Sequence, residues 1–428
     1  MIKKTLVWVL PLVFCLLPAI GSSELQPLTD EAARIYAKHK ESVYQIRIIN
    51  LDTDKKTTIG SGFQISSQGH IATNYHVISD VVHEPQRHRL EFLTHDGSVG
   101  PLKVIDIDVI HDLAIVKSAQ RPSDFIRLGA EKWTKGARVF SMGNPFDLGM
   151  TIIEGTYNGH MKNALYKKIL FSGSLNPGMS GGPALDHNGE VMGVNVSTAG
   201  NQVSFLVPVD YLRLLYARIK DLGDQEVKRD WKAYIQQQLY RHQDRYLEDI
   251  IQSEWKHMSI GDARVPAEIS NIFKCWGRSE EAENKLYRTT YTDCYCEDVI
   301  YVSNTLSTGQ IIYRYNWVSG EKMNAIRFYN LFEELYTYHE DYDNAERKDV
   351  TNFQCQDSFV RISGQKTRVS MCARKYKDYP QLFDVHVAVA SVHLKNRGLL
   401  THLSLLGIGK TRAQAFVKKF LENIKWKK

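Results

Sequence analysis

A glycine-rich stretch, residues 176–183, constrains what this chain can fold into more than any other part of the sequence. The stretch reads Asn-Pro-Gly-Met-Ser-Gly-Gly-Pro and places Ser180 between Gly178 and Gly181. Glycine adopts backbone conformations that are closed to larger residues and lets the backbone approach another molecule closely. Strings of Gly, Ser and Pro are more often plain turns. A serine on such a turn can also be a nucleophile, and the N–H groups of Gly178 and Ser180 can then converge to form an oxyanion hole.

A nucleophilic serine needs a base, and the base needs a group that orients it. His76 lies in the run 71–78, and Asp112 lies in the run 109–117. Both runs are apolar and β-prone, so we expect each polar residue to be held at the end of a strand. A lone histidine is more often a structural residue than a catalyst. The order His, Asp, Ser across fitting segments outweighs that reading.

Two other carboxylates, Asp106 and Asp108, compete with Asp112 for the orienting role. Asp112 is preferred because the apolar residues 113–116 after it would bury its backbone and shield its bond to His76. The predicted catalytic residues are therefore His76, Asp112 and Ser180.

These motifs resemble those of the HtrA/Deg-type trypsin-like serine proteases. The resemblance covers about residues 38–215 and rests on the segments 60–63, 73–77, 112–114, 143–145, 176–183 and 189–195. It implies two six-stranded antiparallel β-barrels of the chymotrypsin fold, with the triad in the cleft between them. One departure is Met179, where that family usually has asparagine. The backbone of this residue matters more than its side chain, so the departure does not argue against activity.

The resemblance also implies a substrate pocket. In chymotrypsin-like folds the floor lies six residues before the nucleophile, and the strands that follow supply the walls. Carried onto this chain, the predicted pocket residues are Ser174, Leu175, Asn195, Ser197, Thr198, Ser204, Phe205 and Leu206. None of them is a carboxylate that could pair with a buried Lys or Arg. We therefore expect the pocket to prefer small or medium aliphatic side chains.

The pattern of the first half fits an all-β domain. Short strands separated by turn residues are typical of a barrel or sandwich. They are expected at residues 42–50, 62–66, 70–78, 90–94, 102–107, 137–142, 150–157, 168–172, 191–196 and 203–207, with helices at 28–40 and 209–219.

The N-terminus reads as a targeting signal, with residues 1–23 as a cleavable signal peptide. Lys3 and Lys4 precede an apolar run over residues 5–20, and small residues follow. An uncleaved anchor is the alternative, but the run is short for a membrane span of about 20 residues. We expect an exported protein, periplasmic or secreted, without stable membrane insertion after cleavage.

The predicted protease domain spans residues 24–222, and residues 223–428 form an α+β domain of unknown function. That domain is expected to open with a long helix over about 225–256. Paired strands are expected at 294–302 and 310–318, a helix at 325–336, and strands at 359–363, 368–373, 383–394 and 399–406. A last helix would begin with Thr411 as its N-cap. The carboxylate-binding loop of the PDZ domains that usually follow an HtrA protease is not recognisable here.

The cysteines of the mature chain all lie in the second half: Cys275, Cys294, Cys296, Cys355 and Cys372. In an exported protein they are better read as disulfides than as a metal site. We expect Cys355 to pair with Cys372, and Cys275 to pair with either Cys294 or Cys296. One thiol would remain.

The chain of 428 residues, with a net charge of +6 and no arginine-rich tract, gives no reason to expect nucleic acid as a partner. The expected partners are polypeptide substrates, with misfolded envelope proteins as one candidate class, and no cofactor is required. The leading hypothesis is a serine endopeptidase. The alternative is a catalytically silent, protease-fold binding protein of the cell envelope whose C-terminal domain recognises a partner. The intact triad and glycine turn argue against that alternative.

Overall fold

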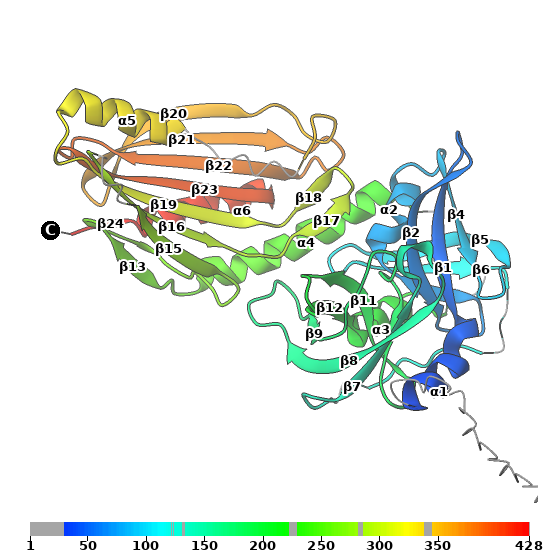
Figure 1. Ribbon diagram of the computed structural model, residues 1–428. Helices are drawn as coiled ribbons and strands as arrows, with labels where there is room; N and C mark the ends of the chain where they lie inside the picture. Colours follow the sequence, from blue (N-terminus) through cyan, green and yellow to red (C-terminus); the bar gives the residue numbers. More distant parts are fainter. Residues whose placement is uncertain are drawn as a thin grey trace, which may run out of the picture.

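The computed structural model describes residues 30–427, except 121, 123, 131–132, 222–228, 281–285 and 338–344. Two closed barrels form the first half, and a seven-stranded sheet with helices forms the second (Figure 1). The predicted signal peptide, residues 1–23, and the predicted domain boundary near residue 222 lie outside the described residues. Among those that are described, no helix is long and apolar enough to cross a membrane.

The first barrel has the strand order β1-β2-β3-β6-β5-β4. Its strands are β1 (Val43–Asn50), β2 (Lys55–Gln64), β3 (His70–Thr73), β4 (His88–Leu93), β5 (Val99–Asp108) and β6 (Leu113–Ser118). Successive side chains of a strand face opposite sides, so one face of each strand supplies the core. In β4, for example, the buried Leu90 and Phe92 alternate with Arg89 and Glu91.

The second barrel repeats this plan with the order β10-β11-β12-β9-β8-β7. Its strands are β7 (Arg138–Gly143), β8 (Thr151–His160), β9 (Ile169–Phe171), β10 (Pro183–Leu185), β11 (Val191–Thr198) and β12 (Ser204–Pro208). Two helices, α1 (Asp30–His39) and α3 (Val209–Ala217), pack in the core cluster between the barrels. The predicted pair of six-stranded barrels is confirmed.

The prediction of a single strand over residues 70–78 is wrong for the residues after Thr73. The strand β3 ends at Thr73, and helix α2 (Tyr75–His83) begins directly after Asn74. The β-branched Val77 and Ile78 favour a strand locally. Asp112 overrides that preference, because its backbone carbonyl accepts from the Tyr75 N–H at 3.3 Å and its carboxylate accepts from the His76 N–H at 2.8 Å. These bonds satisfy donors that a helix N-terminus leaves unpaired.

The second half is built on an antiparallel sheet in the order β15-β16-β19-β23-β22-β21-β20. Its strands are β15 (Lys274–Glu280), β16 (Arg288–Tyr295), β19 (Ile311–Ser319), β20 (Gln354–Ile362), β21 (Gln365–Lys375), β22 (Leu382–Ser391) and β23 (Arg397–Gly409). The small strands are β13 (His257–Ile260), β14 (Ala263–Pro266), β17 (Ile300–Ser303), β18 (Leu306–Thr308) and β24 (Lys425–Trp426). The predicted α+β composition is confirmed.

Three helices accompany this sheet: α4 (Trp231–Gln252), α5 (Ala325–Thr337) and α6 (Lys410–Glu422). The helix α6 and the C-terminal part of α4 pack in one core cluster with the sheet, and α5 forms another cluster with it. The N-cap of α4 is Asp230, whose carboxylate accepts from the Ala233 N–H at 3.1 Å. The prediction of Thr411 as an N-cap is wrong, because Gly409 occupies that position and Thr411 lies inside α6.

The predicted strand 294–302 is also wrong beyond Tyr295. The chain leaves the sheet there, and residues 300–303 pair instead with residues 306–308 as the separate hairpin β17–β18. The strand β16 pairs with β19 over Arg288–Tyr295, with Cys294 opposite Tyr313. The sheet therefore receives only the start of the predicted strand.

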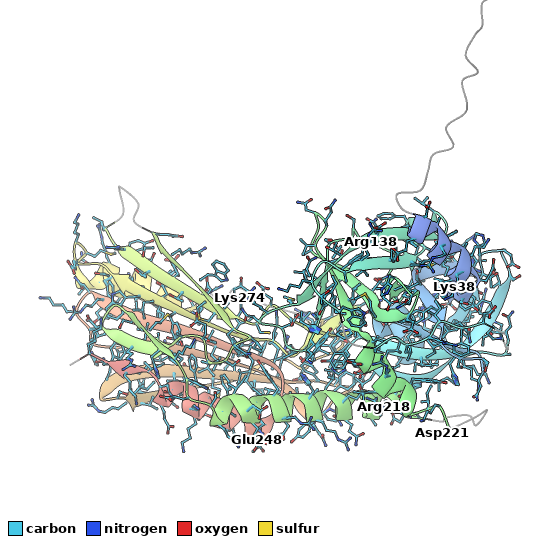
Figure 2. All side chains as sticks on the ribbon, turned by 90° about the horizontal axis from the view of Figure 1, so that it is seen from below. Lys38, Arg138, Arg218, Asp221, Glu248 and Lys274 are labelled. Atoms are coloured by element: carbon cyan, nitrogen blue, oxygen red, sulfur yellow. A yellow bond between two sulfur atoms is a disulfide. The ribbon has the colours of Figure 1, made fainter. Side chains whose placement is uncertain are left out.

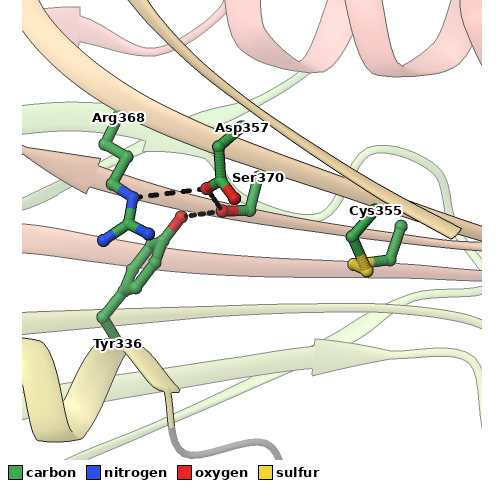
Figure 3. The surroundings of a disulfide bond; sticks show 6 residues. Tyr336, Cys355, Asp357, Arg368 and Ser370 are labelled. Atoms are coloured by element: carbon green, nitrogen blue, oxygen red, sulfur yellow. Dashed lines mark hydrogen bonds and ion pairs between the residues drawn. A yellow bond between two sulfur atoms is a disulfide. The ribbon is translucent and has the colours of Figure 1, made fainter. Parts of the chain in front are cut away.

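Two disulfides join directly opposed residues of neighbouring strands. Cys355 pairs with Cys372 across β20 and β21, and Cys275 pairs with Cys294 across β15 and β16. Figure 3 shows the first of these beside Asp357, which bonds Arg368 and Ser370. The predicted 355–372 bond is confirmed, and of the two alternatives for Cys275 the pairing with Cys294 is the one formed. Cys296 is a buried thiol whose pKa is raised to about 11 by burial.

The two halves share a hydrophobic core. One cluster contains barrel residues such as Tyr75 and Phe92 together with Leu239 of α4 and Val302 and Tyr379 of the second half. The helix α4 runs from the barrels to the sheet (Figure 1), and in Figure 2 it extends from near Arg218 past Glu248.

Polar contacts reinforce this junction. On α4, the Gln238 amide bonds both the Val109 N–H and the Ile107 carbonyl at 3.0 Å. Lys168 of the second barrel pairs with Asp298 of the second half at 2.5 Å. The halves are thus joined over a packed, buried surface.

Candidate active site

The predicted catalytic residues come from three different elements at the junction of the barrels. His76 lies in the first turn of α2, Asp112 lies on the turn between β5 and β6, and Ser180 lies on the glycine turn before β10. His76 and Asp112 therefore belong to the first barrel and Ser180 to the second. Asp112 directly precedes strand β6, as the sequence suggested, whereas His76 lies in a helix and not at the end of a strand.

Asp112 bonds His76 twice. Its carboxylate lies 2.6 Å from the imidazole Nδ1 and also accepts from the His76 backbone N–H at 2.8 Å. Its own carbonyl accepts from the Asn74 side-chain amide at 2.7 Å. Asp112 has a φ of 54°, a left-handed conformation that Asp tolerates better than most residues. The backbone and the ring of His76 are thus fixed by one side chain, which leaves Nε2 to face away from Asp112.

Two opposing effects act on the pKa of His76. Burial of the imidazole lowers it, whereas the charge of Asp112 and its hydrogen bond raise it. The Asp112 contribution prevails, so the pKa of His76 lies above the ordinary value for histidine. The side chain of His76 remains 29% exposed and that of Asp112 14%, so substrate can reach the imidazole.

This pKa predicts the pH dependence of any reaction in which His76 acts as a base. Only the neutral imidazole accepts a proton, so kcat/KM should fall as the pH drops below the pKa of His76. We expect the midpoint of this fall above the ordinary histidine value of about 6.5. Rates measured between about pH 5 and about pH 9 check this, with the variant His95→Ala, an exposed turn histidine, as control. A midpoint below that ordinary value would contradict the assignment.

The two competing carboxylates have other partners. The buried Asp106 pairs with Arg229, and the buried Asp108 binds His111 at 2.9 Å and Arg218 at 3.6 Å. Burial opposes ionisation of Asp108, but its bond to His111 and the charges of His111 and Arg218 lower its pKa overall. Of the three aspartates, Asp112 is the one that contacts His76.

The turn that carries Ser180 requires its glycines. Gly178 and Gly181 have φ values of 96° and 86°, in the region that side chains disfavour. A Cβ on Gly178 would lie 2.3 Å from the Asn144 carbonyl oxygen, and one on Gly181 would lie 2.2 Å from that of Ser61. The turn therefore packs too closely against both barrels for any other residue type at these positions.

The Ser180 hydroxyl donates to the Val196 carbonyl at 3.3 Å. Within the described part of the chain, no hydrogen bond joins it to His76. Catalytic hydrogen bonds are often long or misaligned before substrate binds. A rotation about the Cα–Cβ bond of Ser180 is the movement that would redirect the hydroxyl.

The N–H groups predicted to form the oxyanion hole, those of Gly178 and Ser180, belong to peptides whose carbonyls have other partners. The Pro177 carbonyl accepts from the Phe146 N–H at 2.8 Å, and the Met179 carbonyl accepts from the Gly182 N–H at 3.1 Å. In a trans peptide the N–H points away from the carbonyl, so the N–H groups of Gly178 and Ser180 point away from these partners. Neither N–H donates a hydrogen bond within the residues that the structure describes.

A hollow of about 530 Å³ adjoins this turn. It is lined by the predicted Ser174, Leu175 and Thr198, together with Asn176 and residues 200–202. Of the described residues that line it, none carries a charge. Residues 200–202 follow β11 as a turn, and sequence reasoning missed them.

The remaining predicted pocket residues lie outside the lining of this hollow. Asn195, Ser204 and Leu206 are buried and do not line this hollow, and neither do Ser197 and Phe205, which lie opposite each other on β11 and β12.

Asn195 supports the turn from behind. Its side-chain amide donates to the Met179 carbonyl at 3.2 Å and to the Met142 carbonyl at 3.1 Å. Its backbone carbonyl accepts from the Gly181 N–H at 2.9 Å. A buried asparagine between Val194 and Val196 is the sequence signal that could have indicated this role.

Paired closed barrels with His, Asp and Ser side chains at their junction are typical of trypsin-like peptidases. The family model of the trypsin-like peptidase domain matches residues 60–194, which include His76, Asp112 and Ser180.

The relatives are of the HtrA/Deg type. A probable periplasmic DegP-like serine endoprotease of Chlamydia trachomatis is 32% identical over 160 residues, which cover 35% of this chain and 31% of the relative. Serine protease HTRA1 of Xenopus laevis is 32% identical over 168 residues, which cover 37% of this chain and 35% of the relative. The chain thus spans about a third of the length of these curated relatives. The predicted resemblance to HtrA/Deg-type trypsin-like serine proteases is confirmed for the first half.

A solved structure is also similar. The crystal structure of the serine endoprotease from Yersinia pestis has a TM-score of 0.40 and 23% sequence identity, and the match covers 46% of this chain and 69% of that one.

Proposed function

We propose that this chain is a serine endopeptidase that hydrolyses peptide bonds of polypeptide substrates through His76, Asp112 and Ser180. The observation that carries the proposal is the pair of hydrogen bonds by which the Asp112 carboxylate holds both the backbone N–H and the ring of His76. That arrangement fixes the proton on Nδ1, so Nε2 is the basic nitrogen, as a serine triad requires. The trypsin-like peptidase match over the same residues supports it.

In the proposed reaction, Ser180 Oγ attacks the substrate carbonyl carbon while His76 Nε2 takes the hydroxyl proton. The N–H groups of Gly178 and Ser180 stabilise the oxyanion, and Asp112 stabilises the imidazolium that has formed. His76 then gives the proton to the leaving amine, and the C–N bond breaks to leave an acyl-enzyme. Water, activated by His76, hydrolyses this ester and restores Ser180.

We further propose that the protein is exported and acts in the periplasm or outside the cell. The Chlamydia relative is named as periplasmic, and residues 1–23 have the pattern of a signal peptide. Two disulfides fit an oxidising compartment. Polypeptides, with misfolded envelope proteins among them, are the substrate class that this location and the named activity of the relatives favour.

A catalytically silent binding protein is the second candidate. The observation in its favour is the Ser180 hydroxyl, which bonds the Val196 carbonyl instead of His76. A rotation about the Cα–Cβ bond of Ser180 would free this hydroxyl. The bond of the Asp112 carboxylate to Nδ1 of the His76 ring is the contact that a silent protein would not require. The endopeptidase is therefore the better-supported function.

Hydrolysis of unfolded casein by the purified mature chain tests the proposal. We expect hydrolysis that a serine-directed phosphonate abolishes and a metal chelator leaves unchanged. A preparation that binds casein without cutting it would support the silent binding protein instead. Cutting that survives the phosphonate would contradict the role of Ser180.

The uncharged hollow predicts which bonds are cut. A Lys or Arg head group buried there would lack a partner, and an unpaired buried charge costs several kcal/mol. We expect cleavage after Val, Ala or Leu to exceed cleavage after Lys or Arg by at least about 100-fold in kcat/KM. Mass spectrometry of the casein fragments measures this preference. Dominant cleavage after Lys or Arg would show that an acidic group reaches the pocket.

A further inference from the structure

The hairpin β17–β18 of the second half lies against α2, the helix that carries His76 (Figure 1). The Val302 carbonyl of this hairpin accepts from the Tyr75 hydroxyl at 2.7 Å and lies 2.9 Å from His83 Nε2. Tyr75 directly precedes His76, and His83 is the last residue of α2. Both ends of the helix are therefore bonded to one carbonyl from the other half of the chain.

A second set of bonds holds the middle of α2. Asn304, in the turn of the hairpin, donates to the Asp80 carboxylate at 2.8 Å. The Tyr301 hydroxyl lies 3.0 Å from Ser79 Oγ, to which it can donate, and 2.8 Å from the Asn304 side-chain oxygen. Ser79 Oγ in turn donates to the His76 backbone carbonyl at 3.2 Å. A continuous chain of bonds thus runs from the hairpin to the backbone of His76.

The ring of Tyr301 contacts the imidazole of His76 itself. The ring centroids are 6.0 Å apart with the planes at 74°, the edge-to-face arrangement that aromatic pairs prefer. Asp112 fixes the Nδ1 side of the imidazole. Tyr301 therefore adds a second constraint on the ring, which a hydrogen bond at one nitrogen does not supply alone.

The hairpin is rigid enough to impose this constraint. Ile300, Val302 and Leu306 are at most 4% exposed and belong to the core cluster shared by both halves. A side chain positions another group well when its own neighbours fix it. Here the buried hairpin fixes Tyr301, and Tyr301 borders His76.

We propose that Tyr301 is a positioning residue that holds the His76 imidazole in its productive orientation, so that the second half of the chain completes the active site. The expected effect of Tyr301 on kcat rests on the proposed function, because it requires that the chain hydrolyses peptides. Tyr301 itself transfers no proton and touches no reacting atom. It acts by limiting the orientations of the imidazole while Ser180 and substrate approach.

The test compares three full-length variants with the unmodified chain: Tyr301→Ala, Tyr301→Phe and Tyr329→Ala. Tyr329 is a 43% exposed tyrosine on α5, remote from the hairpin, and serves as control. We expect Tyr301→Ala to lower kcat about 10- to 100-fold with KM changed less than about threefold. Tyr301→Phe keeps the ring and should retain kcat within about threefold, and Tyr329→Ala should match the unmodified chain.

A proton NMR signature separates this proposal from the proposed function. The Nδ1 proton of His76, bonded to Asp112, should give a far-downfield resonance that His76→Ala removes. We expect Tyr301→Phe to keep this resonance and Tyr301→Ala to broaden or lose it, whether or not the chain hydrolyses peptides. If the melting temperature of Tyr301→Ala is well below that of the unmodified chain, Tyr301→Leu is used in its place. Leucine keeps the apolar bulk of the side chain but lacks the ring.

The outcomes are distinct. The positioning role would be overturned if Tyr301→Ala, or Tyr301→Leu in its place, left the His76 resonance unchanged. In an active enzyme, kcat would also have to be unchanged. A chain that shows no hydrolysis but loses the resonance in Tyr301→Ala would retain the positioning role and refute the proposed function.

Discussion

Replacing Ser180 by alanine should lower kcat for peptide hydrolysis by about 10⁴- to 10⁶-fold, the usual loss when a triad member is removed. Without Oγ no acyl-enzyme can form, while the proposed oxyanion hole and substrate pocket persist. The turn should keep its shape, because its glycines and the bonds of Asn195 involve the backbone around Ser180 and not the hydroxyl. Hydrolysis of a peptide with a reporter group, measured on the purified variant, gives the loss directly.

Two further variants sharpen this result. Ser259, exposed on β13, supplies the control Ser259→Ala, which should hydrolyse as the unmodified chain does. The double variant Ser180→Ala/His76→Ala should be little worse than either single variant, because the two residues act as one unit. Additive losses, or near-normal hydrolysis by Ser180→Ala, would show that another group is the nucleophile.

Replacing Asp112 by asparagine should lower kcat by about 10⁴-fold, because an amide favours the wrong tautomer of the His76 ring. Asparagine has the same shape and also tolerates the left-handed backbone of residue 112. The expected loss therefore reflects the charge and the hydrogen bond to Nδ1, with little change in melting temperature. Kinetics and thermal unfolding of the same preparation separate these effects.

The neighbouring Asp108 provides the contrast. Asp108→Asn removes a buried charge that binds His111 and Arg218, so it should lower the melting temperature. Its folded fraction should nevertheless keep kcat within about tenfold, because Asp108 does not contact His76. If Asp108→Asn lost activity as strongly as Asp112→Asn, the orienting role would have been given to the wrong aspartate.

The family resemblance predicted the two barrels, and local pattern predicted most of their strands. Alternating strands such as β4 and the turn with Gly178 and Gly181 depend on side-chain periodicity and on backbone conformations that glycine alone accepts easily. The order of His76, Asp112 and Ser180 also lies in the sequence itself. The adjacent pairing of Cys355 with Cys372 followed from the short hairpin between them.

What the sequence did not predict depends on contacts between distant residues. The run after Thr73 is β-prone, and it becomes α2 because Asp112, far along the chain, bonds the first N–H groups of the helix. Asn195 was expected in the pocket wall, but its amide is held by the Met142 and Met179 carbonyls. Local pattern contains no information about such partners.

The hairpin β17–β18 is the clearest case of this limit. Residues 300–302 were read as the end of a longer strand, and residues 307–309 as the turn that follows it. The structure instead places the hairpin in a core shared with the first barrel, with Tyr301 beside His76. No sequence feature of residues 300–308 indicates a contact more than two hundred positions away.

Covalent labelling by a fluorophosphonate tests the central claim, that Ser180 is an activated nucleophile, most directly. Intact-mass measurement and peptide mapping of the full-length mature chain would locate the adduct. We expect a single adduct, on Ser180, in the unmodified chain and in Ser259→Ala. We expect no adduct in Ser180→Ala or His76→Ala. An unlabelled chain, or labelling that persists in Ser180→Ala, would contradict the claim.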